Sequence, residues 1–129
     1  MAAVLRAVLV ALLLLTACDS VDPDDRPKGS LTVTAALITN PPALGDNELK
    51  LHVSDVTGTA VSDANISAEP WMPAMGHGVS FEPKCAHTNG GEYGCTGVYF
   101  SMPGTWEIRI EAATARATGS LTLTYDIGK

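Results

Sequence analysis

Apolar and polar residues alternate one by one in several stretches of this chain, and this period of two strongly constrains its fold. The alternation is clearest in the stretches 31–34, 49–53, 106–111 and 121–125. Successive side chains of a β-strand point to opposite faces of a sheet, so each stretch predicts a strand with one buried face. No part of the chain after residue 30 repeats with the 3.6-residue period of an amphipathic helix. We therefore expect an all-β protein.

Segments rich in glycine, proline and asparagine separate these stretches, as turns require. They cover residues 40–47, 55–65, 88–94 and 102–104. Further strands are expected over residues 64–69, 78–82 and 92–100, which brings the total to about seven. Short strands with regularly spaced turns predict an immunoglobulin-like antiparallel β-sandwich.

The first 17 residues have the composition of a secretory signal peptide. Arg6 supplies the only early positive charge, the apolar run Ala7–Leu15 is too short to span a bilayer, and Leu-Thr-Ala-Cys follows at positions 15–18. This ending resembles a bacterial lipobox, which predicts that Cys18 is acylated and becomes the new N-terminus. The alternative is an ordinary signal peptide whose cleavage site lies near a cysteine. A lipidated Cys18 would anchor the protein to a membrane of the bacterial cell envelope, facing the periplasm or the exterior.

Residues 18–30 form the next segment, with the lipidated cysteine followed by DSVDPDDRPKGS. This run is rich in aspartate and proline and has almost no apolar residues, so we expect a flexible acidic tether. The β-sandwich domain is expected over residues 31–129, a length that supports a single core.

The charge balance is acidic, with 14 Asp and Glu against 8 Lys and Arg. Loss of the signal peptide removes Arg6 and no acidic residue. An acidic surface argues against binding to nucleic acid and against electrostatic docking on anionic lipid. It favours cationic partners, metal ions included.

The chain has three cysteines, which leaves Cys85 and Cys95 as a pair once Cys18 is assigned to lipid. Outside the cytoplasm such a pair favours a disulfide. Its spacing is too short for the inter-sheet bridge of an antibody domain, so we expect it to cross a hairpin with its tip at residues 89–91. A free thiol pair that binds metal is the competing interpretation.

The segment PWMPAMGHG, residues 70–78, places two methionines, a tryptophan and a histidine among prolines and glycines. Proline and glycine disfavour a regular strand here, so we expect a loop or a strand edge. In an extended chain Met75 and His77 would leave the same face, with Met72 and Trp71 nearby. Thioether sulfur suits Cu(I) and imidazole suits copper or zinc, so Met72, Met75 and His77 predict a Cu(I) site. Trp71 would shield the ion or lie over it.

The alternative is that these side chains only fill the core, since methionine is a common gap filler. The distribution of methionine argues against this. Of four methionines, one is the initiator, two lie in this segment, and Met102 lies in another turn.

PWMPAMGHG and the later segment GVYFSMPGTWEIRI, residues 97–110, together resemble the YtkA-like domain family. That family is related to FixH-like proteins and similar in architecture to the CopC copper-binding sandwiches. The segments GDNELKLHVSD and TGTAVSDANISAEP extend the resemblance to roughly residues 31–112. It implies an immunoglobulin-type sandwich that is exported or membrane-attached and handles copper. It also implies Met72, Met75 and His77 as ligands, with Met102 as a fourth contact.

Residues 83–95 depart from the pattern of the family, because they insert the cysteine pair and His87. We expect the cysteines to stabilise the hairpin and keep His87 as a further candidate ligand. His52 alternates with Leu51 and Val53 and is expected to be a solvated strand residue, outside the site.

No catalytic arrangement is evident, because no Gly-rich phosphate loop precedes a helix and no nucleophile has both a base and an orienting group. We therefore expect a protein that is not an enzyme. The first hypothesis is a lipid-anchored module that takes Cu(I) from, or passes it to, a copper-donor or copper-acceptor protein. The second is an immunoglobulin-like scaffold lipoprotein without metal, which docks a partner through the Trp and Met loop.

Overall fold

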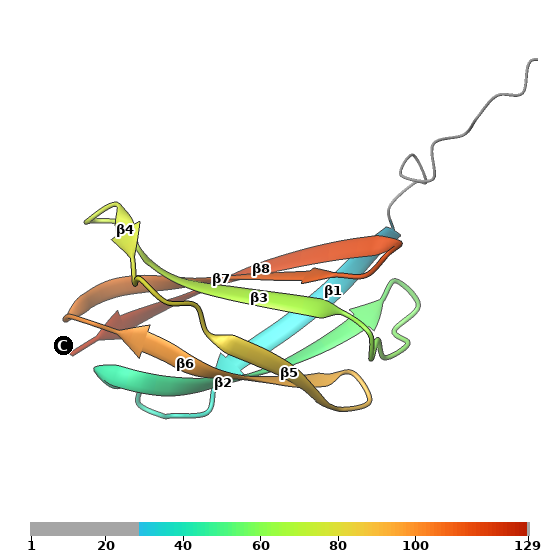
Figure 1. Cartoon of the computed structure of the whole chain (residues 1–129), viewed down its shortest axis with the longest axis horizontal. Coiled ribbons are helices and arrows are strands. Elements are labelled where there is room, and N and C mark those ends of the chain that lie inside the picture. Colours follow the sequence, from blue (N-terminus) through green and yellow to red (C-terminus); the bar gives the residue numbers. More distant parts are fainter. Residues whose placement is uncertain (1–28, 129) are drawn as a thin grey trace, which may run out of the picture.

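Eight β-strands are present in residues 29–128, the part of the chain that the computed structural model describes (Figure 1). They are β1 (Gly29–Leu37), β2 (Gly45–Asp55), β3 (Asn65–Met72), β4 (His77–Gly78), β5 (Lys84–Asn89), β6 (Glu92–Phe100), β7 (Gly104–Ala113) and β8 (Ala117–Ile127). The predicted signal peptide, Cys18 and most of the predicted tether lie outside the described residues. Within residues 29–128 there is no helix with the length and apolar character needed to cross a membrane.

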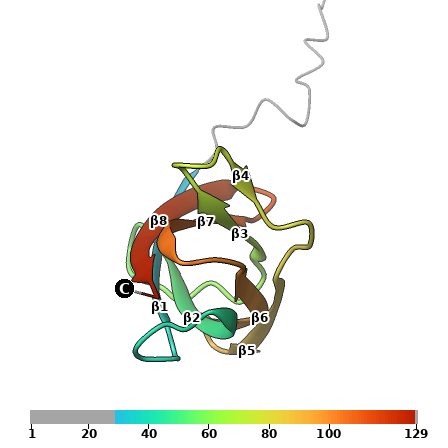
Figure 2. The same cartoon turned by 90° about the vertical axis from the view of Figure 1, so that its left-hand side faces the viewer.

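The strands form one curled sheet in the order β4-β3-β7-β8-β1-β2-β6-β5. β1 joins its two halves: Gly29 and Ser30 pair in parallel with β8, whereas residues 31–37 pair antiparallel with β2. The sheet therefore folds into two layers, with β4, β3, β7 and β8 in one and β1, β2, β6 and β5 in the other (Figure 2). The predicted immunoglobulin-like β-sandwich is confirmed, with eight described strands in place of about seven.

Most strands are longer than the sequence predicted, and two differences bear on the topology. β1 begins at Gly29, two residues before the expected start of the domain. The strand expected over residues 78–82 is wrong, because only Gly78 of that segment lies in a strand, and the next strand is β5. Since β4 pairs with β3 in one layer and β5 pairs with β6 in the other, residues 79–83 serve as the crossing between layers. Pro83, which has no N–H to donate to a ladder, stands just before β5.

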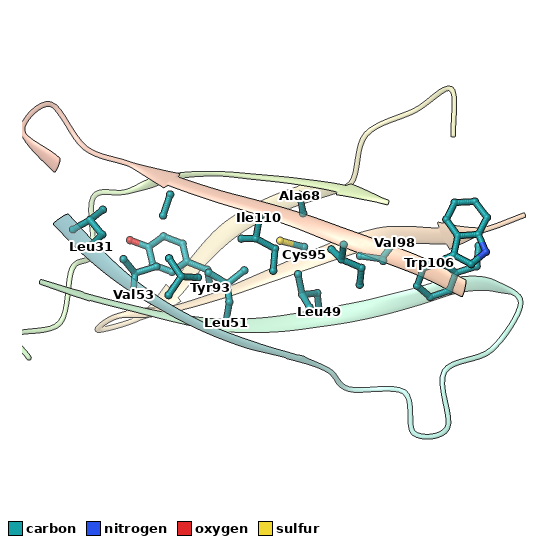
Figure 3. Close-up of a cluster of buried hydrophobic side chains, with 14 of the residues drawn as sticks. Leu31, Leu49, Leu51, Val53, Ala68, Tyr93, Cys95, Val98, Trp106 and Ile110 are labelled. Carbon is teal, nitrogen blue, oxygen red and sulfur yellow. The ribbon is translucent and has the colours of Figure 1, made fainter. Parts of the chain in front are cut away.

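Alternating side chains of the two layers meet in a shared core. In β2 the inward apolar residues are Leu49, Leu51 and Val53, and in β7 they begin with Trp106. Figure 3 shows these side chains between the layers, with Trp106 at one end of the cluster and Leu31 at the other. Full burial of each large apolar side chain contributes roughly 1.5–3 kcal/mol, so this core supplies the main driving force for folding.

The cysteine pair lies in the β5–β6 hairpin. Cys85 and Cys95 stand directly opposite each other on the two strands and form a disulfide. Cys95 is buried in the core, whereas Cys85 is half-buried at the sheet edge. The predicted disulfide is therefore confirmed, and it ties the edge strand β5 to the core strand β6.

The turn after β2 is organised by Asp55. Its carboxylate accepts hydrogen bonds from the hydroxyl and N–H of Thr57, at 2.6 and 2.9 Å, and from the N–H of Thr59, at 3.0 Å. These bonds, that from the Thr57 hydroxyl foremost, favour the ionised carboxylate and lower the pKa of Asp55. Asp55 therefore fixes how the chain leaves β2.

Candidate metal site

The segment PWMPAMGHG forms the end of β3, a tight turn over residues 73–76, and β4. The carbonyl oxygen of Met72 accepts hydrogen bonds from the N–H groups of Met75 and Gly76, at 3.1 and 3.0 Å. Gly76 has a φ of 65°, which a glycine adopts without strain. The expected loop is thus a hairpin turn held by its own backbone.

This turn changes which side chains lie together. The expectation that Met75 and His77 share one face of an extended chain is wrong, because Met75 lies within the turn. Met72 and His77 are instead direct partners across the β3–β4 pair. Directly opposite residues of antiparallel strands have side chains on the same face. The hairpin therefore pairs a thioether with the imidazole, but the thioether is that of Met72.

Met72 points into the sandwich and is only 5 % exposed. Its terminal methyl group fills the space where a side chain at Gly104 would begin, and Gly104 has a φ of 146° that side-chain-bearing residues rarely adopt. Glycine at the start of β7 is thus required both by the backbone and by the packing of Met72. The thioether of Met72 therefore packs in the core, at the end where β7 begins.

Met102 lies in the turn between β6 and β7, two residues before Gly104. It is half-buried against the core, and its carbonyl oxygen accepts a hydrogen bond from Trp106 Nε1 at 3.0 Å. Because Met72 packs on Gly104, the β3–β4 hairpin and the β6–β7 turn meet at one end of the sandwich (Figure 1). The fold thus brings together two methionine-containing segments that are far apart in the sequence.

Met75 and His77 form the exposed part of this end. Met75 is 56 % exposed, and His77 is also exposed. His77 Nδ1 lies 3.0 Å from the carbonyl oxygen of Gly78. A carbonyl oxygen only accepts hydrogen bonds, so this contact assigns the proton to Nδ1 and leaves the lone pair on Nε2. An Nδ1–H to carbonyl bond is the usual support of a metal-binding histidine.

Trp71 precedes Met72 on the opposite face of β3 and is half-buried. The guanidinium carbon of Arg109 lies 4.7 Å from the centre of its ring, and Arg109 is also paired with Glu107 at 3.0 Å. The cation over Trp71 is therefore Arg109, and Trp71 lies on the face of β3 opposite Met72.

The other two histidines lie elsewhere. His87 Nε2 is 2.7 Å from the carbonyl oxygen of Gly90, and the His87 ring packs edge-on against Tyr93. The β5–β6 turn that this contact closes lies at the opposite end of the sandwich from β4 (Figure 1). His52 Nδ1 pairs with Glu92 Oε1 at 2.9 Å on the outer face of β2, as expected for a solvated strand residue. Neither histidine joins the methionines.

Among residues 29–128, no cluster of three or more His, Cys, Asp or Glu side chains is placed to hold a metal ion. The candidate donors are instead methionine and histidine side chains. They lie where the β3–β4 hairpin meets the β6–β7 turn, which we call the methionine-containing end. They comprise exposed Met75 and His77 and half-buried Met102, whereas Met72 is buried beneath them.

A family model described as YtkA-like matches residues 28–111, more than half of the chain. The chain belongs to the YtkA-like family. The match includes the β3–β4 hairpin, the β6–β7 turn and Trp106, so the resemblance noted from the sequence is confirmed. A comparison with curated proteins found no match.

Among solved structures, the YtkA-like domain is similar to the crystal structure of the Lin-41 filamin domain. The TM-score is 0.50 at 16 % sequence identity, and the match covers 72 % of this chain and 90 % of the other. At this identity the likeness concerns the fold alone, and it supports the immunoglobulin-like architecture.

The sequence interpretation missed the burial of Met72, although a signal was present. Ala68, Pro70 and Met72 are all inward-facing in β3, so continuing the alternation of the expected strand 64–69 by three residues places Met72 in the core. The dependence of Met72 on Gly104 had no such signal, because it joins segments that only the tertiary fold brings together.

Proposed function

We propose that this YtkA-like protein binds Cu(I) at the end of the sandwich formed by the β3–β4 hairpin and the β6–β7 turn, and passes the ion on. The observation that carries the proposal is the contact of Met72 with Gly104. It brings the β3–β4 hairpin, which carries Met75 and His77, to the β6–β7 turn, which carries Met102. Thioether and imidazole are soft and borderline donors that select Cu(I).

The exposed donors fit a protein that transfers its ion. Met75 reaches solvent from the hairpin turn, and His77 has its Nε2 lone pair available. A thioether is neutral and holds copper less firmly than a thiolate, so an ion bound here would exchange readily. Met102, half-buried in the adjacent turn, is the third donor of the proposed set.

We further propose that the protein is an envelope lipoprotein anchored through Cys18, with a copper-donor or copper-acceptor protein as its partner. β1 begins at the end of the sandwich opposite β4 (Figure 1). This arrangement supports a domain that presents the methionine-containing end away from its anchor. The acidic net charge of −6 suits a cationic cargo and gives no reason to expect nucleic acid or an anionic membrane surface as a partner.

A second candidate is docking of a partner protein without metal. It is favoured by the exposure of Met75, because flexible methionine side chains adapt to partner surfaces. Trp71 supports this candidate less than the sequence suggested, since Arg109 already covers its ring. Capture of a partner by copper-free protein that takes up no Cu(I) would favour docking.

The test of copper binding is a Cu(I) competition titration with matched variants. We expect a single equivalent to bind, and we expect Met75→Leu and His77→Ala each to weaken binding at least tenfold, about 1.4 kcal/mol each. His52→Ala removes an exposed histidine that lies elsewhere and serves as the control, with unchanged affinity. Unchanged binding in the Met75→Leu/His77→Ala double variant would refute the site.

A further inference from the structure

The donors at the methionine-containing end differ sharply in how far they reach solvent. Met72 is 5 % exposed and Met75 is 56 % exposed. His77, opposite Met72 on the hairpin, is exposed as well. Two exposed donors above a buried packing side chain do not form an enclosed cage. This difference, taken together with the proposed function, indicates how the ion would be held and released.

We infer that Cu(I) sits on Met75 and His77 at the rim, that Met72 is a packing residue beneath the site, and that the recipient enters the coordination sphere before these ligands leave. The inference rests on the proposed Cu(I) binding. It assigns different roles to two methionines that the sequence pattern treats as equivalent.

Both the main chain and the side chain of Met72 are held in place. Its backbone carbonyl accepts the two hydrogen bonds that close the turn, so its main chain is fixed. Its methyl group fills the space above Gly104, within the same core cluster as Trp106. Turning the thioether outward would leave an apolar cavity in the core, which is costly because interiors are close-packed. Met75 has no such constraint.

The exchange step follows from this exposure. A tetrahedral Cu(I) ion held by Met75 and His77, even with Met102 as a third donor, keeps a coordination position toward solvent. A thioether, imidazole or thiolate of the recipient forms its bond to copper there, after which the bonds to Met75 sulfur and His77 Nε2 break. Copper stays Cu(I) throughout. The proton stays on His77 Nδ1, which keeps its hydrogen bond to the Gly78 carbonyl oxygen. Because this chain is acidic, the matching recipient surface is neutral or basic.

The experiment measures Cu(I) transfer from the full chain, purified in detergent, to the chelator bathocuproine disulfonate. We expect the observed rate to rise in proportion to chelator concentration, because the chelator enters before the protein ligands leave. We also expect Met72→Leu, a swap of similar volume, to change the Cu(I) affinity and this slope by no more than about twofold. Met75→Leu should weaken the affinity at least about tenfold.

Two results would overturn the inference while leaving the proposed function intact. One is a transfer rate that does not depend on chelator concentration, since this means that the ion must first leave a closed site. The other is a loss of affinity in Met72→Leu equal to that in Met75→Leu, with the circular dichroism spectrum unchanged. Failure of the wild-type chain to take up Cu(I) would refute the proposed function itself.

Discussion

Replacing Trp106 with alanine should lower the free energy of unfolding by about 3–5 kcal/mol, the loss typical of a large aromatic side chain removed from a core. Trp106 is fully buried, and its ring lies 5.5 Å from that of Phe100. Its Nε1 also donates a hydrogen bond to the Met102 carbonyl oxygen, so the variant loses this link between the β6–β7 turn and the core. Since small domains have roughly 5–15 kcal/mol of stability in total, the variant should be close to unfolding.

Urea unfolding followed by far-ultraviolet circular dichroism measures this loss. Trp106→Phe is the control, because it keeps an aromatic ring against Phe100 but gives up the bond to Met102. We expect it to lose clearly less stability than Trp106→Ala. Equal stability of Trp106→Ala and the wild type would mean that this end of the core is not packed as described.

Removing the disulfide with the double variant Cys85→Ala/Cys95→Ala should cost about 2.5–3 kcal/mol, because the bond closes a short loop in the unfolded chain. The two cysteines are 10 positions apart, and β5, which the bond secures, is an edge strand. The melting temperature should fall by roughly 10 °C or more. Alanine is chosen because a serine at position 95 would bury a hydroxyl in the core.

Calorimetry of the double variant, beside reduced and oxidised wild type, checks this result. Reduced wild type should melt near the double variant. Because the β5–β6 turn and the β3–β4 hairpin lie at opposite ends of the sandwich, Cu(I) affinity should stay unchanged. A double variant that melts with the oxidised wild type would show that the bond does not stabilise the domain.

Much of the fold was predictable because its signal is local. Leu49, Leu51 and Val53 alternate with polar residues, and this alternation alone places them on the inner face of β2. The strand at residues 84–89 was not predicted as such, because the alternating residues just before it, 79–82, look more like a strand than β5 itself. Those residues connect the two layers. Which segment makes this connection depends on how the layers pack, and the local sequence does not show that.

The candidate site was predictable in composition but not in arrangement. The sequence indicates that methionine and histidine cluster in residues 70–78, and the fold does bring that segment to the β6–β7 turn, which contains Met102. The depth of each side chain depends on tertiary contacts. Gly104 makes room for Met72, and the turn over residues 73–76 carries Met75 into solvent. The contact with Gly104 leaves no trace in the local pattern, whereas the alternation of β3 and the proline and glycine of residues 73–76 are visible in the sequence.

The most direct test of the proposed copper site is X-ray absorption at the copper edge of the Cu(I)-loaded protein. We expect thioether sulfur and an imidazole nitrogen among the neighbours of the ion, with the nitrogen lost in His77→Ala and the sulfur reduced in Met75→Leu. A spectrum without sulfur neighbours, or one that neither substitution changes, would contradict binding of Cu(I) at the β3–β4 hairpin.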